Sequence, residues 1–125
     1  ESRVALVTTA APYQPDKGDQ GPGAPYNSAA KFYTVYTDTT ETDPDLRVSH
    51  IGIDRNYTTA EDMRTWFPLQ QLKRLASEGV IGGITERFYG APTNRSQKRT
   101  MEVDCPEIYE RIREDGGDIA VIIAN

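Results

Sequence analysis

Residues 3–9 read Arg-Val-Ala-Leu-Val-Thr-Thr, and residues 118–125 read Asp-Ile-Ala-Val-Ile-Ile-Ala-Asn. Each stretch holds an uninterrupted apolar run, which is typical of a strand that is covered on both faces in a parallel sheet. Helical patterns lie between these two strands in the chain. This order predicts an α/β fold with an open, mostly parallel sheet and flanking helices, formed as a single domain or part-domain over residues 1–125.

Composition limits the function classes of such a domain. The chain has 125 residues and a formal net charge of −5, which argues against nucleic-acid binding because phosphate contacts need clustered Lys and Arg. No apolar run approaches the roughly 18 residues of a membrane helix. The single cysteine, Cys105, excludes an internal disulfide and a multi-cysteine metal site. We therefore expect a cytoplasmic protein with no membrane or nucleic-acid partner and no cofactor or metal within this chain.

Two helices are expected between the outer strands. The first follows Pro68, carries leucines on one face and ends at Gly79. The second is expected to begin at Asp104-Cys105-Pro106-Glu107, because proline is tolerated only near a helix start, and to end at Gly116-Gly117.

The remaining segments are shorter or irregular. The prolines and glycines of residues 11–30 predict a long loop. Aromatic and β-branched residues predict a strand over residues 31–37, followed by a polar turn over 38–45 and a short strand over 46–49. We expect one helical turn over 59–65, and a short strand or ordered loop over 80–85.

Candidate ligand-binding residues follow the expected strands. In open parallel sheets, ligands bind beyond the carboxyl ends of the strands. Thr8 and Thr9 end the first strand and can bind carboxylate or phosphate oxygens, although threonine is also an ordinary strand residue. Asn125 follows the last strand. The segment after Thr9 lacks the glycines of a nucleotide-binding loop, which disfavours NAD and ATP.

Other candidate residues each have a structural alternative. His50 is the one histidine and is either a proton donor or substrate ligand, or the maker of a single structural hydrogen bond. Asp54 follows one turn later as a polar pocket residue. Phe88 and Tyr89 either line a pocket or belong to the core. Cys105, at an expected helix start, is more simply a structural thiol than a nucleophile.

Several motifs carry a family resemblance. They are VALVTTA at residues 4–10, HIGID at 50–54, RTWFPL at 64–69, EGVIG at 78–82, the Phe88-Tyr89 pair and DIAVII at 118–123. In this order and spacing they resemble the glycine/sarcosine/betaine/D-proline reductase selenoprotein B family. Ile53 stands where that family has an aromatic residue, and the loop over residues 11–30 has no counterpart in the resemblance.

The resemblance implies reductive cleavage of a carbon–nitrogen bond in a small amino acid or amine, with electrons from thiols. It also implies that a reactive cysteine or selenocysteine, or a pyruvoyl group made by self-cleavage, follows the last strand on an adjoining piece. Because the chain ends at Asn125, we expect a second subunit or a downstream segment of the same precursor to complete the sheet. His50 and Asn125 are then expected to be catalytic, and the substrate-binding residues to be Thr8, Thr9, Asp54, Phe88 and Tyr89.

Two other functions remain open from the sequence. A non-reductive enzyme on the same scaffold, such as a lyase of specialised metabolism, would work without a dithiol. A non-catalytic binding or scaffolding subunit would form a stable complex but hold no reactive group. Fold resemblance does not decide among these functions.

Overall fold

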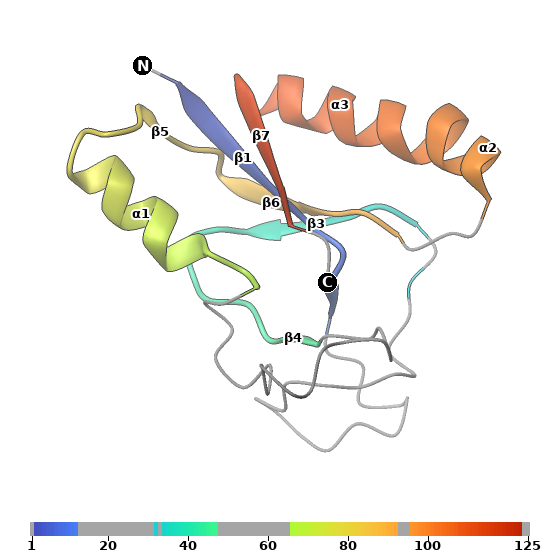
Figure 1. Cartoon of the computed structure of the whole chain (residues 1–125), viewed down its shortest axis with the longest axis horizontal. Helices are drawn as coiled ribbons and strands as arrows, with labels where there is room; N and C mark the ends of the chain where they lie inside the picture. The colour runs from blue at the N-terminus through green and yellow to red at the C-terminus, as the bar shows by residue number, and fades with distance from the viewer. Residues whose placement is uncertain (1, 13–31, 33, 48–65, 93–95, 124–125) are drawn as a thin grey trace.

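The computed structural model describes residues 2–12, 32, 34–47, 66–92 and 96–123 (Figure 1). Its centre is β1 (Arg3–Thr8), which belongs to a five-stranded sheet with β3 (Tyr36–Thr39), β5 (Gly83–Ile84), β6 (Arg87–Gly90) and β7 (Ile119–Ile123). All pairs that involve β1 are parallel, and β3 joins β6 antiparallel. The predicted α/β fold with a mostly parallel sheet is confirmed.

The two edges of β1 hold different partners. Val4 pairs with Ile84 of β5 and also with Ile119 of β7, so β5 and β7 lie on opposite edges. Thr8 likewise pairs with Gly90 of β6 and with Ile123 of β7. The order across the sheet is therefore β3, then β6 together with β5, then β1, then β7.

The two main helices cover opposite faces of this sheet (Figure 1). On one face, the even-numbered β1 residues Val4 and Leu6 join a core cluster with Leu72 of α1 (Leu69–Ser77). On the other face, Ala5 and Val7 belong to a cluster against which Ile108 and Ile112 of α3 (Cys105–Glu114) pack. Both core clusters therefore meet at β1, which is buried from Val4 to Thr8.

The helix α1 agrees with the sequence. Pro68 occupies the N-cap position, and the buried residues Leu69 and Leu72 face the sheet. The helix ends at Ser77, and Gly79 follows its C-cap residue with a φ of +76°, a left-handed conformation that favours glycine. The amide of Val80 then donates to the Leu75 carbonyl at 2.9 Å, which closes the last turn.

The second helix begins earlier than predicted. It starts with α2 (Gln97–Arg99), where the Ser96 hydroxyl caps the helix by accepting from the Arg99 amide at 3.2 Å. A π-helical turn, η3 (Thr100–Asp104), then leads into α3. Asp104 makes no capping hydrogen bond, because the residues before Pro106 are already helical. Pro106 has no N–H to donate, and the wider π-helical turn precedes it. Gly116, with φ of +74°, follows the end of α3 as expected.

The shorter strands also correct several predictions. The strand predicted at 31–37 lies at Tyr36–Thr39, so the polar turn begins later than residue 38. β6 was not predicted as a strand at all. The predicted loop does not begin at residue 11, because β2 (Ala11–Pro12) pairs antiparallel with β4 (Leu46–Arg47). These segments become strands through partners distant in sequence. The remainder of that loop and the predicted turn at 59–65 lie outside the described residues.

β7 departs from its predicted burial on both faces. Ile119 is 49% exposed and Ile122 is 66% exposed. Val121 and Ile123 pack only partly against the core cluster of α1. The reason is positional, since β7 pairs with β1 on one edge and, within the described residues, no strand pairs with its other edge.

Candidate functional site

The strand order reverses at the carboxyl ends of β1 and β7. From β1, the chain reaches β6 on one side, and from β6 it crosses back to β7 on the other side. Such a reversal is the point where open α/β sheets bind ligands, because the connecting loops diverge there. Thr8 and Ile123 are paired at this end of the two strands.

The two predicted threonines have different environments at this point. Thr8 is fully buried, and its hydroxyl oxygen accepts from the Ala10 amide at 3.0 Å. Its carbonyl accepts from the Ala91 amide at 2.8 Å. Thr9 lies one residue beyond the strand and is partly exposed. Of the two, Thr9 is therefore the residue that reaches the surface.

Tyr36 holds the turn that follows β1. Its hydroxyl donates to the Ala10 carbonyl at 2.6 Å, and its ring lies edge-on to Phe88 with centroids 5.9 Å apart. Burial, and then the charge of Asp38, raises the pKa of Tyr36 well above its usual value, so its hydroxyl stays a neutral donor. A Cβ atom on Gly90 would lie 1.9 Å from the Tyr36 ring, so glycine is required for this close approach.

A buried cation lies just beyond the same strand end. Arg47 of β4 pairs with Ala11 of β2 and is 0% exposed. Its guanidinium forms an ion pair with Asp45 and donates to the Leu46 carbonyl at 3.1 Å. Because Asp45 pairs with this charge and Arg47 is fully buried, the pair is a structural contact behind the strand end. Sequence reasoning missed Tyr36 and Arg47 as site residues, because each looks like an ordinary strand residue.

The other predicted site residues do not meet in one described pocket. Phe88 is buried on the α1 face, with its ring centroid 5.0 Å from that of Phe67. Tyr89 is buried on the α3 face, because neighbouring strand residues point to opposite sides. His50, Asp54 and Asn125 lie outside the described residues. Cys105 is exposed at the first residue of α3.

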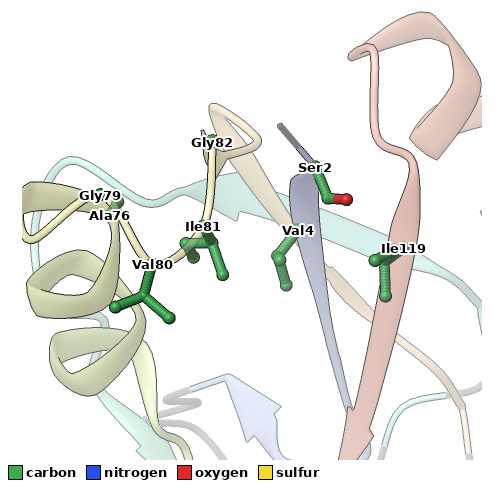
Figure 2. A pocket seen from close by; sticks show the side chains of 8 residues that line it. All are labelled: Ser2, Val4, Ala76, Gly79, Val80, Ile81, Gly82 and Ile119. Carbon is green, nitrogen blue, oxygen red and sulfur yellow. The ribbon is translucent and has the colours of Figure 1, made fainter.

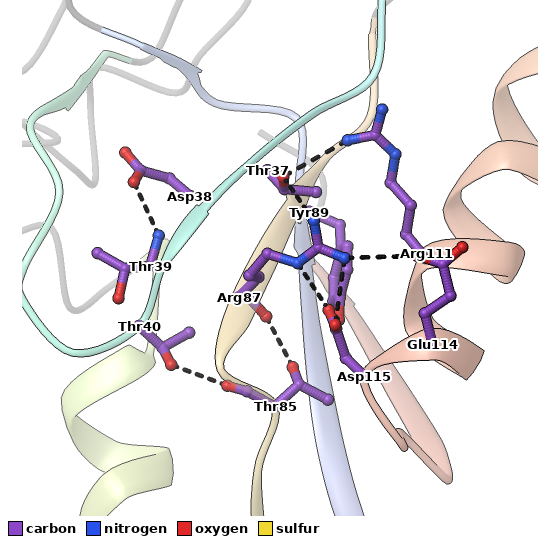
Figure 3. Close-up of polar contacts among 10 residues, drawn as sticks. All are labelled: Thr37, Asp38, Thr39, Thr40, Thr85, Arg87, Tyr89, Arg111, Glu114 and Asp115. Carbon is purple, nitrogen blue, oxygen red and sulfur yellow. Dashed lines mark hydrogen bonds and ion pairs between the residues drawn. The ribbon is translucent and has the colours of Figure 1, made fainter.

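A polar cluster joins the end of α3 to β6 (Figure 3). Arg87 donates from Nε and Nη2 to the Asp115 carboxylate at 2.9 and 3.1 Å. The Tyr89 hydroxyl donates to the same carboxylate at 2.5 Å. Because Arg87 begins β6, this cluster lies away from the carboxyl end of the sheet. Its geometry is that of a structural clamp between helix and strand.

The clamp also shifts the ionisation of its members. Burial, and then the hydrogen bond to Asp115, raises the pKa of Tyr89 to about 12. Burial by itself would raise the pKa of Asp115, but the hydrogen bonds from Arg87 and Tyr89 outweigh it and lower that pKa below its usual value. The carboxylate is therefore held charged and the phenol neutral across the ordinary pH range.

A pocket of about 580 Å³ opens beside the amino-terminal half of β1 (Figure 2). Val4 lies between Val80 and Ile81 on one side and Ile119 of β7 on the other. No charged side chain lines this pocket, and Ser2 supplies the one side-chain hydroxyl among its lining residues. The pocket lies at the opposite end of the strands from Thr8 and holds no acidic or basic side chain.

Among the described residues, no group of three or more His, Cys, Asp or Glu side chains is arranged to hold a metal ion. None of the helices in this described part of the chain has the length and apolar character needed to cross a membrane.

Comparison with known proteins gives a distant relative. The chain is 31% identical over 124 residues to the D-proline reductase subunit gamma of Acetoanaerobium sticklandii, a match that covers 97% of this chain and 48% of the relative. The chain thus spans about half the length of the curated relative that it matches. No protein-family model matches the sequence, and no solved structure does. This match supports a distant relationship to a reductase subunit and agrees to that extent with the family resemblance of the sequence motifs.

Proposed function

We propose that this chain forms one wall of the substrate site of a reductase-like subunit, at the carboxyl ends of β1 and β7. The strand order carries this proposal, because it pairs Thr8 with Ile123 at the reversal point where such sheets bind ligands. The distant relationship to a D-proline reductase subunit supports the reaction class and membership of a multi-subunit complex.

The reaction in this proposal is the reductive cleavage of a carbon–nitrogen bond. The bond breaks, the carbon and the nitrogen each gain a hydrogen, and a dithiol supplies the two electrons as it becomes a disulfide. The adjoining piece of protein supplies the reactive selenol, thiol or pyruvoyl group. The residues of this chain bind and orient a small amino acid or amine.

Residues near the end of β1 and in the adjoining segments have separate roles in the proposed site. The partly exposed Thr9 hydroxyl donates to a substrate carboxylate oxygen. Tyr36 keeps the turn after β1 in place through its bond to the Ala10 carbonyl. His50 is proposed as a proton donor, Asp54 as a polar pocket residue and Asn125 as the residue at the catalytic junction.

A chimera tests the reaction class. This chain replaces the matched segment of the A. sticklandii subunit gamma within its reductase complex, and the unmodified complex is the positive control. Glycine, sarcosine, betaine and D-proline are offered with and without a dithiol. We expect dithiol-dependent consumption of at least one of them. Consumption without a dithiol would favour the lyase-like alternative, and a stable complex that consumes none would favour the scaffolding alternative.

A pair of threonine variants tests the site. Thr9→Val removes a hydroxyl at the strand end, and Thr39→Val removes one from another partly exposed strand position in β3. A hydrogen bond to a charged group is worth about 1.5–3 kcal/mol, which corresponds to a loss of roughly 10- to 100-fold in kcat/KM. We expect this loss for Thr9→Val and less than about twofold for the control. Equal effects of the two variants would remove Thr9 from the site.

A further inference from the structure

β7 has the composition of an interior strand but the surroundings of an edge strand. Its five residues, Ile119–Ile123, are all apolar. In β1 the comparable residues Val4 and Leu6 are 4% and 2% exposed, whereas Ile122 of β7 is 66% exposed. β1 has strands on both edges and helices on both faces. Within the described residues, β7 has a strand on one edge and no helix over Ile122.

The backbone of β7 also offers hydrogen-bonding groups away from β1. The Val4 and Thr8 carbonyls accept from the Thr85 and Ala91 amides on the β5 and β6 edge of β1, so the main-chain groups of Ala5 and Val7 face β7. Ala5 and Val7 lie opposite Ala120 and Ile122, and in a parallel pair a residue bonds to the two neighbours of its opposite residue. The amides of Ala120 and Ile122 therefore face the outer edge. An exposed apolar strand with a free outer edge is a template for pairing.

We propose that β7 is an interior strand of a wider sheet, completed by a parallel strand–helix unit from the part of a gamma-type subunit that this chain does not span. The length comparison identifies this occupant, because the chain covers 48% of its relative. A parallel strand pairs with the outer edge of β7, and its connecting helix covers the exposed face. The proposal concerns sheet assembly and does not depend on the chemistry proposed above.

The handedness of the connections determines which face the helix covers. The step from β6 through α3 to β7 moves across the sheet in one direction, with α3 on the face of Ala5 and Val7. Parallel crossovers are almost always right-handed, so a further step in the same direction places its helix on that same face. Ile122 alternates with Val121, which packs on the α1 face, so Ile122 points toward the new helix.

Within the described residues, the outer edge of β7 has no partner strand and Ile122 is 66% exposed, so an occupant must fill the edge and cover Ile122. Pairing of β7 with β7 from a second copy would occupy the edge but would bring no helix over Ile122. The strand–helix unit satisfies both requirements, and a second copy satisfies one.

Hydrogen exchange in two proteins gives the first test. The chain alone is compared with a fusion in which it replaces the matched segment of the A. sticklandii subunit gamma polypeptide. We expect the amides of Ala120 and Ile122 to exchange at least 100-fold more slowly in the fusion, while the Val121 amide, which faces β1, changes less. Equal exchange of the outer-edge amides in both proteins would overturn the proposal, as would a fusion that does not unfold cooperatively.

A matched pair of lysine variants gives the second test. Ile122→Lys and Met101→Lys change residues that are 66% and 65% exposed, and Met101 lies in η3, away from β7. In the chain alone we expect both to shift Tm by less than about 3 °C. In the fusion, Ile122→Lys should lower Tm by about 5–10 °C while Met101→Lys stays harmless. Equal shifts of Tm for the two variants in the fusion would overturn the proposal. A dimer of the chain alone that Ile122→Lys dissociates would also overturn it, because the occupant of the edge would then be a second copy.

Discussion

Replacing Asp115 with alanine should destabilise the fold by removing the shared acceptor of the clamp. The Asp115 carboxylate accepts from the Arg87 guanidinium at 2.9 and 3.1 Å and from the Tyr89 hydroxyl at 2.5 Å. Tyr89 is 0% exposed, so water cannot replace the lost acceptor for its hydroxyl. Arg87 is different, since its side chain is 36% exposed and water can solvate it.

The expected magnitude follows from these two environments. A buried hydroxyl without a partner costs about 1–3 kcal/mol. The partly exposed ion pair of Arg87 adds at most about 1 kcal/mol, because solvent screens it. We therefore expect Asp115→Ala to lower the free energy of unfolding by about 2–4 kcal/mol. Tyr89→Phe in the same background should recover about 1 kcal/mol or more, because it removes the unpaired hydroxyl.

Urea unfolding followed by circular dichroism at pH 7 measures these changes. The matched control is Glu114→Ala, which changes the preceding acidic residue, whose side chain is 68% exposed and lies 3.8 Å from Arg87. The control should cost about 0.5 kcal/mol or less. If the two alanine variants lose the same stability, the hydroxyl of Tyr89 does not depend on Asp115, and the clamp as described is refuted.

Four further results are expected from the structure. Gly90→Ala places a Cβ 1.9 Å from the Tyr36 ring, so it should cost about 1–3 kcal/mol in urea unfolding, and much less in a Tyr36→Ala background. Gly79→Ala forces φ of +76° on a residue with a side chain and should cost about 1–2 kcal/mol, although nothing lies within 4 Å of the added atom. Because the pKa of Asp115 is lowered in the folded state, the free energy of unfolding falls as pH drops below about 5. In Asp115→Ala the free energy of unfolding should depend less on pH over this acidic range. The pKa of Tyr89 is raised from 10.0 to about 12 in the folded state, so the free energy of unfolding also falls as pH rises through that interval. Thermal melts across pH 9–12 would measure this loss. A melting temperature that stays constant over this range would contradict it.

Local signals explain which elements were predictable. The helix α1 needs only its own residues, with Pro68 before it, leucines on one face and Gly79 after it. β1 was equally clear, because its apolar run is buried on both faces. By contrast, β6 becomes a strand through pairing with β1 and β3, and no pattern within its four residues indicates this. The second helix begins early because of the Ser96 cap and a π-helical turn. The proline at residue 106 had instead indicated a later start in the sequence.

The location of Thr8 and Thr9 at the end of β1 was predictable from the sequence, but the residues around them were not. The rule about strand ends pointed to Thr8 and Thr9, and the structure places them beside the reversal point. The contact between Tyr36 and Ala10 joins residues that are 26 positions apart, so no local pattern could reveal it. The same applies to the buried Arg47, which reaches the site through the pairing of β2 with β4.

The open edge of β7 and the proposed substrate site are consequences of one strand order. Ile123 is paired with Thr8, so a strand added in parallel to the outer edge of β7 ends near the same point of the sheet. A helix that follows such a strand begins at that end, and a helix N-terminus stabilises an anionic thiolate or selenolate. A reactive residue supplied by the added unit would therefore lie at the same end of the sheet as Thr9. Sheet completion and assembly of the reactive site would then be a single event, and a variant such as Ile122→Lys would impair turnover through assembly without touching a substrate-binding group.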